Sequence, residues 1–188
     1  MSIRPICITG DPVLHTPALE VTVFDDSLRT LVQDMFETMD EAPGVGLAAP
    51  QVGVNLRVFV YDWDKEDGTP QRGVVINPKL ELSETPSGEP EWETESEGCL
   101  SVPGERFPLK RAERATLTGV DLDQNPVRID AEGWFARIFQ HEFDHLNGTL
   151  YVDRLAEPYK TDASNVVTER GWGIPGLSWL PGEERLEG

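Results

Sequence analysis

The segment with the clearest chemical potential is His141-Glu142-Phe143-Asp144-His145, which holds two of the three histidines of the chain. Residues four apart share one face of a helix, so the two imidazoles can converge on one metal ion. Glu142 is next to His141 and can reach a water molecule at that ion, as in the H-E-x-x-H zinc hydrolases. The alternative is a pair of solvent-exposed histidines beside a chance glutamate. The apolar residues around the motif favour the metal site, because buried histidines need polar partners.

A catalytic metal site usually takes three protein ligands and leaves one position for water. No histidine follows His145. The acidic candidates downstream are Asp153, Glu157 and Asp162. Upstream, Cys99 lies between Gly98 and Leu100, in a segment where a thiolate could face a pocket. A free cysteine is more often a small buried apolar residue, so these residues by themselves leave the third ligand open.

The motif needs a helix to position it, and the pattern predicts one over residues 133–146, with Gly148 placed to end it. Trp134 and Ile138 fall on the same stripe as the two histidines, so we expect this stripe to be buried. An earlier amphipathic helix is predicted over residues 27–41, where apolar residues recur at helical spacing.

Short runs of β-branched and aromatic residues predict strands around these helices. The predicted strands cover residues 57–61, 73–76, 115–121 and 127–129. Residues 82–97 are polar and acidic, and are expected to form a loop or hairpin. A weak helix and an aromatic stretch at residues 171–179 follow in the tail. Several short strands with two helices indicate an α+β fold.

The composition limits the classes of protein. A chain of 188 residues with 27% charged and 38% apolar residues suits one globular domain. Sixteen basic residues against 34 acidic ones give a net charge of -18, which argues against direct nucleic-acid binding. Two cysteines form no disulfide framework, and no signal peptide or membrane-spanning run is evident, so a cytoplasmic protein without membrane partners is expected.

Three segments together resemble the signatures of the peptide deformylase family. They are GVGLAAPQ at residues 44–51, EGCLS at 97–101 and QHEFDHL at 140–146. The resemblance spans about residues 5–155, and the ending at 171–179 is similar to a tail of one bacterial branch. It therefore implies a single catalytic domain at residues 1–155 and a docked C-terminal extension at 156–188. The implied fold is α+β, with mostly antiparallel β-strands packed around a central helix that carries the HExxH motif.

The resemblance also implies roles for individual residues. The implied metal ligands are Cys99, His141 and His145. Glu142 is the implied acid and base, while Gln51 and the backbone N–H of Leu100 are expected to stabilise the oxyanion.

The resemblance further implies how the substrate is held. The backbone of Val45 and Gly46 is expected to bind it as an added strand. A methionine side chain would lie in an apolar pocket near Val45, Trp134 and Ile138. Arg106 is expected to contact the peptide backbone at the pocket rim, although a plain surface arginine is a close alternative.

Three further features bear on this family pattern. Arg137 lies one turn before His141, where family members often have an apolar residue. Either its stem packs while its head reaches water, or it reshapes the pocket. Asp144 is predicted to pair with Arg111, a pairing that is frequent in the family. The acidic tail lacks the basic run through which some members dock on the ribosome, so only a transient ribosome association is expected.

The expected function is metal-dependent hydrolysis that removes the N-formyl group from the N-terminal formylmethionine of newly synthesised polypeptides and releases formate. The resemblance implies one Fe²⁺ ion per chain, for which Zn²⁺, Ni²⁺ or Co²⁺ can substitute. The formyl-Met N-termini of nascent polypeptides are the expected partners. An HExxH endopeptidase is the nearest rival, and the lack of a downstream histidine argues against it. A non-catalytic module with a structural metal would have four protein ligands and no need of Glu142.

Overall fold

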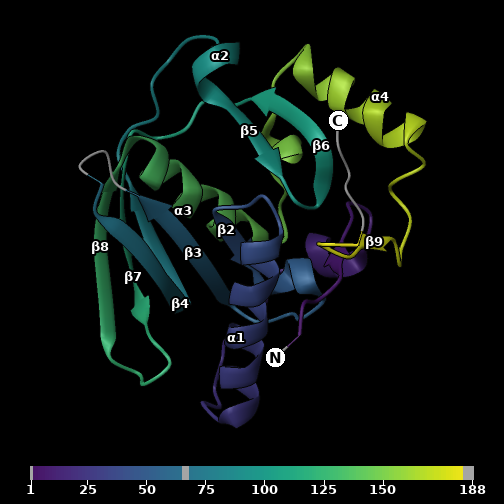
Figure 1. The fold of residues 1–188 in the computed structure, drawn as a ribbon. Coiled ribbons are helices and arrows are strands. Elements are labelled where there is room, and N and C mark those ends of the chain that lie inside the picture. The colour runs from purple at the N-terminus through teal and green to yellow at the C-terminus, as the bar shows by residue number, and fades with distance from the viewer. Residues whose placement is uncertain (1, 65–67, 184–188) are drawn as a thin grey trace.

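The computed structural model describes residues 2–64 and 68–183, and its centre is a five-stranded antiparallel sheet (Figure 1). The strand order is β2-β3-β4-β7-β8, which places β2 at one edge. These strands are β2 (Gly46–Ala48), β3 (Val58–Asp64), β4 (Pro70–Leu82), β7 (Arg114–Val120) and β8 (Pro126–Glu132). A separate hairpin consists of β5 (Ser96–Cys99) and β6 (Val102–Pro108). The predicted α+β fold with mostly antiparallel strands is confirmed.

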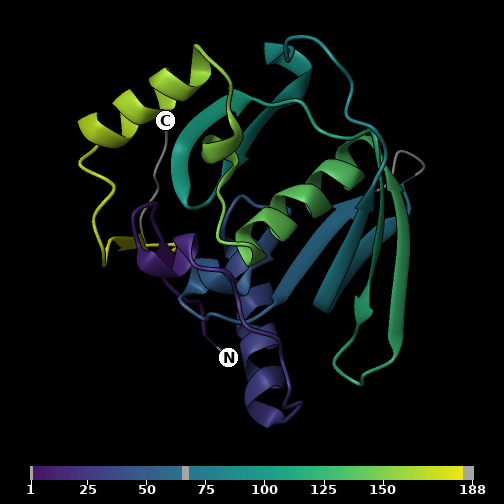
Figure 2. The same cartoon turned by 180° about the vertical axis from the view of Figure 1, so that it is seen from behind.

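Helix α3 (Gly133–Leu146) lies between the large sheet and the β5–β6 hairpin (Figures 1 and 2). Its bounds agree with the prediction, and Gly148 follows its end in the left-handed conformation (φ 70°). Phe135 and Phe139 pack on the sheet, where the Phe139 ring centroid lies 6.0 Å from that of Phe59 and 5.2 Å from that of Tyr61. This apolar face fixes the helix on the sheet, and the opposite side is left to face the hairpin.

Helix α1 (Asp26–Glu41) confirms the second predicted helix. The Asp25 side chain accepts hydrogen bonds from the backbone N–H groups of Ser27 and Leu28, which satisfies two of the free donors at the helix start. The remaining helices are short: η1 (Pro12–His15), η2 (Ala49–Val52), α2 (Trp92–Glu95), η3 (Tyr151–Arg154) and α4 (Tyr159–Glu169).

The sequence predictions were incomplete for the strands and partly wrong for one helix face. Strand β4 runs well beyond residues 73–76, because Asn77 takes a positive φ of 51° at a bulge and lets the strand continue. The Asn77 side chain is fixed there by two hydrogen bonds with the backbone of Val21. The expectation that Trp134 is buried was wrong: it is 40% exposed, because the first turn of α3 reaches the molecular surface.

The two ends of the described chain meet. Strand β9 (Ser178–Trp179) pairs antiparallel with β1 (Ile6–Cys7), and both views show it beside the N-terminal segment (Figures 1 and 2). The division of the chain at residue 155 stays a prediction, and residues 184–188 of the proposed extension lie outside the described residues. No helix in the described part of the chain has the length and apolarity to cross a membrane.

Phe139 provides a test of how strongly this packing holds α3. Its side chain is fully buried among aromatic rings, so Phe139→Ala is expected to lower the free energy of unfolding by about 3–5 kcal/mol. Chemical denaturation would measure the loss. Leu19→Ala, at a side chain that is 64% exposed, is the control and should change stability by no more than about 0.5 kcal/mol. Equal effects of both variants would contradict the packing described here.

Candidate metal centre

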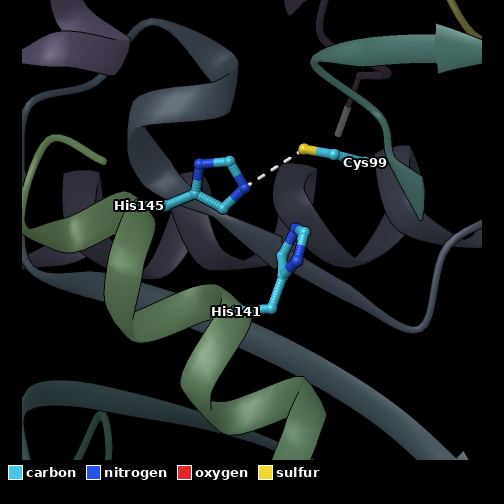
Figure 3. Close-up of side chains that lie close together, drawn as sticks. All are labelled: Cys99, His141 and His145. Atoms are coloured by element: carbon cyan, nitrogen blue, oxygen red, sulfur yellow. Dashed lines mark hydrogen bonds between the residues drawn. The ribbon is translucent and has the colours of Figure 1, made fainter. Parts of the chain in front are cut away.

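Three side chains from two separate parts of the chain converge beside α3. The Sγ atom of Cys99 and one ring nitrogen each of His141 and His145 all lie within 4.8 Å of one another (Figure 3). Among them, Cys99 Sγ and His145 Nε2 lie 3.3 Å apart. The downstream acids take no part, since the carboxylate of Asp153, for example, accepts the backbone N–H of Leu150.

Local structure explains why the sulfur faces the helix. The ladder between β5 and β6 shifts register between Gly98 and Cys99, so that Cys99 pairs with Val102 across a tight turn. The helical repeat of α3 places His141 and His145 one turn apart on the side that faces this turn.

A buried carboxylate orients the first imidazole. Glu97 Oε2 lies 3.0 Å from His141 Nδ1, which leaves Nε2 of that ring directed toward Cys99. Glu97 also accepts hydrogen bonds from Arg111 at 2.7 and 2.9 Å and from Arg137 at 2.8 Å. Burial opposes the charge of Glu97, but the bonds from Arg111 and His141 outweigh it and hold the pKa of the carboxyl well below its usual range. A permanent anion therefore stands behind His141.

The predicted ion pair between Arg111 and Asp144 is confirmed. Arg111 Nη1 lies 2.6 Å from Asp144 Oδ2, and both side chains are buried. Arg154 donates two further hydrogen bonds to the same carboxylate. Asp144 is therefore held by two arginines and is not part of the Cys-His-His cluster.

The donor set suits a divalent transition metal. Burial is the first cause that lowers the pKa of His145 well below its ordinary value, which favours the neutral ring that a metal ligand requires. One sulfur and two imidazole nitrogens are the ligand types that Zn²⁺ and Fe²⁺ accept. Among the described residues, Glu142 Oε2 is buried without a hydrogen-bond partner. This is expected if the oxygen bonds a group that is held at the centre. The residues present thus fit an ion.

Glu142 lies next to this centre in an apolar setting. Burial is the main cause that raises the pKa of its carboxyl to about 7, with the charge of His141 opposing and those of Glu97 and Asp144 adding to the rise. A carboxyl with this pKa can both accept and return a proton near neutral pH. Its carboxylate packs against Gly46, since a Cβ atom at Gly46 would come within 2.3 Å of Glu142 Oε1.

A cavity of about 950 Å³ opens onto the centre. It is lined by Cys99, His141 and Glu142 together with Gln51 and Leu100. The five residues predicted to bind substrate also line it: Val45, Gly46, Arg106, Trp134 and Ile138. The sequence therefore identified residues that the fold brings to one cavity.

Gln51 is held with its amide nitrogen toward the sulfur. Its Oε1 accepts the backbone N–H of Ala48 at 2.9 Å, and its Nε2 lies 3.3 Å from Ser101 Oγ and 3.7 Å from Cys99 Sγ. The last two contacts are long for hydrogen bonds, so the N–H group remains available to a stronger acceptor in the cavity.

Arg137 differs from the first of the two predictions made for it. Its head does not reach water: the residue is 8% exposed and its Nη1 bonds Glu97 and the Leu109 carbonyl, at 2.8 and 2.7 Å. The guanidinium also lies 5.1 Å from the ring centroid of Trp134. Arg137 therefore lies in the wall of the cavity, and the second alternative, that it reshapes the pocket, stays a prediction.

Other residues at the site were missed by sequence reasoning. Tyr151 stacks on His141 with ring centroids 5.9 Å apart, and Trp179 lines the cavity from the tail. Neither has a spacing that relates it to the motif, so no local signal could have found them. Cys7 and His15 are not members of this group; Cys7 packs against the apolar cluster that includes Cys99, and His15 Nε2 accepts the backbone N–H of Gly10.

The α+β fold and the Cys-His-His cluster beside a buried glutamate define a metal-dependent hydrolase of the HExxH kind. Residues 3–161 match the model of the polypeptide deformylase family. The peptide deformylases of Mycolicibacterium paratuberculosis and Mycolicibacterium smegmatis are 55% and 54% identical, over 97% of this chain and 96% of theirs. The chain belongs to the polypeptide deformylase family and is an enzyme.

Solved structures agree with this family. The Ehrlichia chaffeensis peptide deformylase in complex with actinonin superposes with a TM-score of 0.76 at 37% identity, covering 90% of this chain and 98% of that one. The Legionella pneumophila peptide deformylase gives 0.74 at 39% identity, with 90% and 95% covered. The expected fold and family are thus confirmed.

The contact between Gly46 and Glu142 gives a test of the site's geometry. Gly46→Ala is expected to displace the carboxylate and reduce kcat/KM for a formyl-Met peptide by about 100-fold, with bound metal unchanged. Formate release and metal content would be measured on the same sample. Gly98→Ala adds the same methyl where no atom lies closer than 3.6 Å, so it should keep most of the activity. Full activity of Gly46→Ala would argue against this position of Glu142.

Proposed function

We propose that the chain removes the formyl group from formyl-Met N-termini with Cys99, His141 and His145 as ligands of one Fe²⁺ ion and Glu142 as acid and base. Deformylation of new polypeptides is the known role of its family. The observation that carries the assignment of residues is the convergence of three ligand atoms within 4.8 Å, beside a cavity that Cys99, His141 and Glu142 line.

Glu142 performs the proton transfers in this proposal. The ion, when bound, supplies Lewis-acid chemistry that polarises the formyl group and lowers the pKa of water from about 15.7 toward 7. Glu142 accepts the proton of the attacking water as the new C–O bond forms at the formyl carbon. It then returns that proton to the amine nitrogen as the C–N bond breaks, so that formate and a free amino terminus are released.

Two N–H donors stabilise the negative oxygen that forms during attack. Gln51 offers its Nε2 group, whose long contacts to Ser101 and Cys99 leave it free to bind a charged acceptor. The backbone N–H of Leu100 is the second donor, next to the sulfur in sequence. Loss of one such donor typically costs about 3–4 kcal/mol of transition-state stabilisation.

The edge of the sheet is suited to hold the peptide. Strand β2 has β3 on one side only and leads directly into the cavity. We therefore propose that the backbone of Val45 and Gly46 binds the substrate as an added strand. The methionine side chain would pack near Val45, Trp134 and Ile138. Arg106, whose Nη2 bonds the Ser96 carbonyl at the cavity wall, is assigned to the peptide backbone.

Fe²⁺ is the metal we propose, with Zn²⁺, Ni²⁺ or Co²⁺ as substitutes. A site of two imidazoles and one thiolate binds Zn²⁺ more tightly than Fe²⁺, so metal supply must decide the native ion. A reducing compartment such as the cytoplasm is also proposed, because both cysteines are free. Any ribosome association would be transient, since α4 has a single basic residue, Lys160, within its bounds.

Glu142→Ala tests the acid and base assignment. Formate release from a formyl-Met peptide should fall by about 10²–10⁴-fold, because the proton carrier is absent, while the protein retains one Ni²⁺ or Fe²⁺ ion. The protein would be prepared without oxygen, and its metal content measured by mass spectrometry. Normal turnover would remove Glu142 from the mechanism, and cleavage of internal peptide bonds by the wild type would favour an endopeptidase.

Cys99→Ala tests the third ligand. Loss of the sulfur should leave two protein ligands, so we expect metal binding weakened by far more than tenfold and no formate release. Competition with a chromophoric chelator gives the dissociation constant. Cys7→Ala is the matched control, because Cys7 is the other free cysteine and lies outside the cluster. Intact metal binding in Cys99→Ala would show that another group completes the site.

A further inference from the structure

The tail reaches the metal centre through a single indole. Trp179 is 6% exposed, lines the cavity, and lies in β9, where it pairs with Ile6 of β1. Its Nε1–H donates a hydrogen bond to the backbone carbonyl of Leu100 at 2.8 Å. Leu100 is the residue that directly follows Cys99 in the chain.

The same peptide unit contacts the sulfur with its other end. The N–H of Ser101, which shares the amide plane of the Leu100 carbonyl, donates to Cys99 Sγ at 3.4 Å. The hydrogen bonds therefore form a chain from the Trp179 indole, through one amide group, to the sulfur. A donor on the carbonyl of an amide polarises that amide and strengthens the bond that its N–H makes.

We propose that Trp179 is a positioning residue for the Cys99 thiolate, and that the tail in this way sets the orientation and donor strength of a metal ligand. The inference rests on the proposed function, in which Cys99 binds the metal. The hydrogen bond from the Ser101 N–H withdraws electron density from the Cys99 thiolate and fixes the direction of its lone pairs. Groups that bond to a ligand in this manner typically change metal affinity or activity by 10–100-fold.

The surroundings hold Trp179 in register with the Leu100 carbonyl. The next carbonyl, that of Ser101, accepts the N–H of Thr9 at 2.8 Å, and the carbonyl of Thr9 accepts the N–H of Gly173 at 3.0 Å. Gly10 has a φ of 102°, and a Cβ atom there would lie 2.3 Å from the Gly173 backbone. The N-terminal segment is therefore enclosed between the tail and the Cys99 turn, which leaves the indole little freedom to move away.

Trp179→Phe removes the donor and keeps an aromatic ring in place. The probe is Co²⁺ alone, whose thiolate-to-metal charge-transfer absorption reports directly on the sulfur. We expect that absorption to move to longer wavelength, because the thiolate becomes more electron-rich. We also expect the Co²⁺ dissociation constant to rise by about tenfold and kcat to fall by a similar factor, with KM changed less.

Trp172→Phe is the matched control. Trp172 is the other tail tryptophan near the N-terminal segment. It packs against two apolar clusters, one of which includes Cys99, and against Arg170, and within the described part of the chain its indole has no hydrogen bond to the Cys99 turn. It should leave the spectrum and the Co²⁺ affinity unchanged. Replacement of Trp179 by 3-benzothienylalanine, in which sulfur takes the place of the N–H, separates the hydrogen bond from packing and should reproduce the effects of Trp179→Phe.

An unchanged spectrum and Co²⁺ affinity in both Trp179 variants would overturn the inference, even if activity fell, since Trp179 would then act only as a wall of the cavity. If the benzothienylalanine protein kept the wild-type spectrum and Co²⁺ affinity while Trp179→Phe did not, the effect of Trp179→Phe would come from packing. That result would also overturn the inference. Failure of the proposed function is distinguishable, because wild-type protein would then show no thiolate-to-Co²⁺ absorption at all.

Discussion

The site depends on the buried carboxylate of Glu97. It lies in β5, two residues before Cys99, and it bonds His141 and Arg137 of α3 together with Arg111. This one side chain thereby joins two elements: the β5–β6 hairpin, which holds the sulfur, and helix α3, which holds the two imidazoles. A carboxylate in this position costs free energy to bury, and two guanidinium groups offset that cost because their hydrogen bonds saturate its oxygens. These bonds restrain the position of the hairpin relative to α3.

Charge is distributed unevenly in this acidic chain. The net charge is -18. The described acidic residues lie mainly at the surface, while the interior around α3 pairs two anions, Glu97 and Asp144, with Arg111 and Arg137. Paired buried charges are sensitive to geometry, since removal of one partner leaves the other unsatisfied in a medium of low dielectric. The network therefore restrains the side of α3 that the apolar contacts with the sheet do not hold. Glu142 stays outside the network, in a setting that keeps its proton exchangeable.

The ends of the described chain are part of the centre. The N-terminal segment lies between the tail and the turn after Cys99, and Trp179 bonds the Leu100 carbonyl. The tail therefore contributes Trp179 to the wall of the cavity that the motif segments line. Strand β9 of the predicted extension pairs with β1, and the division of the chain at residue 155 stays a prediction.

The sequence by itself determined the two long helices, the pairing of His141 and His145 on one helical face, and the family. These features depend on local periodicity and on short motifs, which backbone geometry converts directly into structure. Only the tertiary structure placed Cys99, and none of the downstream acids, beside the two histidines. It also turned the head of Arg137 inward, left Trp134 exposed and brought the Trp179 indole to the Leu100 carbonyl. Each of those outcomes joins segments far apart in the chain. Such contacts are selected by the packing and charge pairing of the whole fold, and no local spacing encodes them.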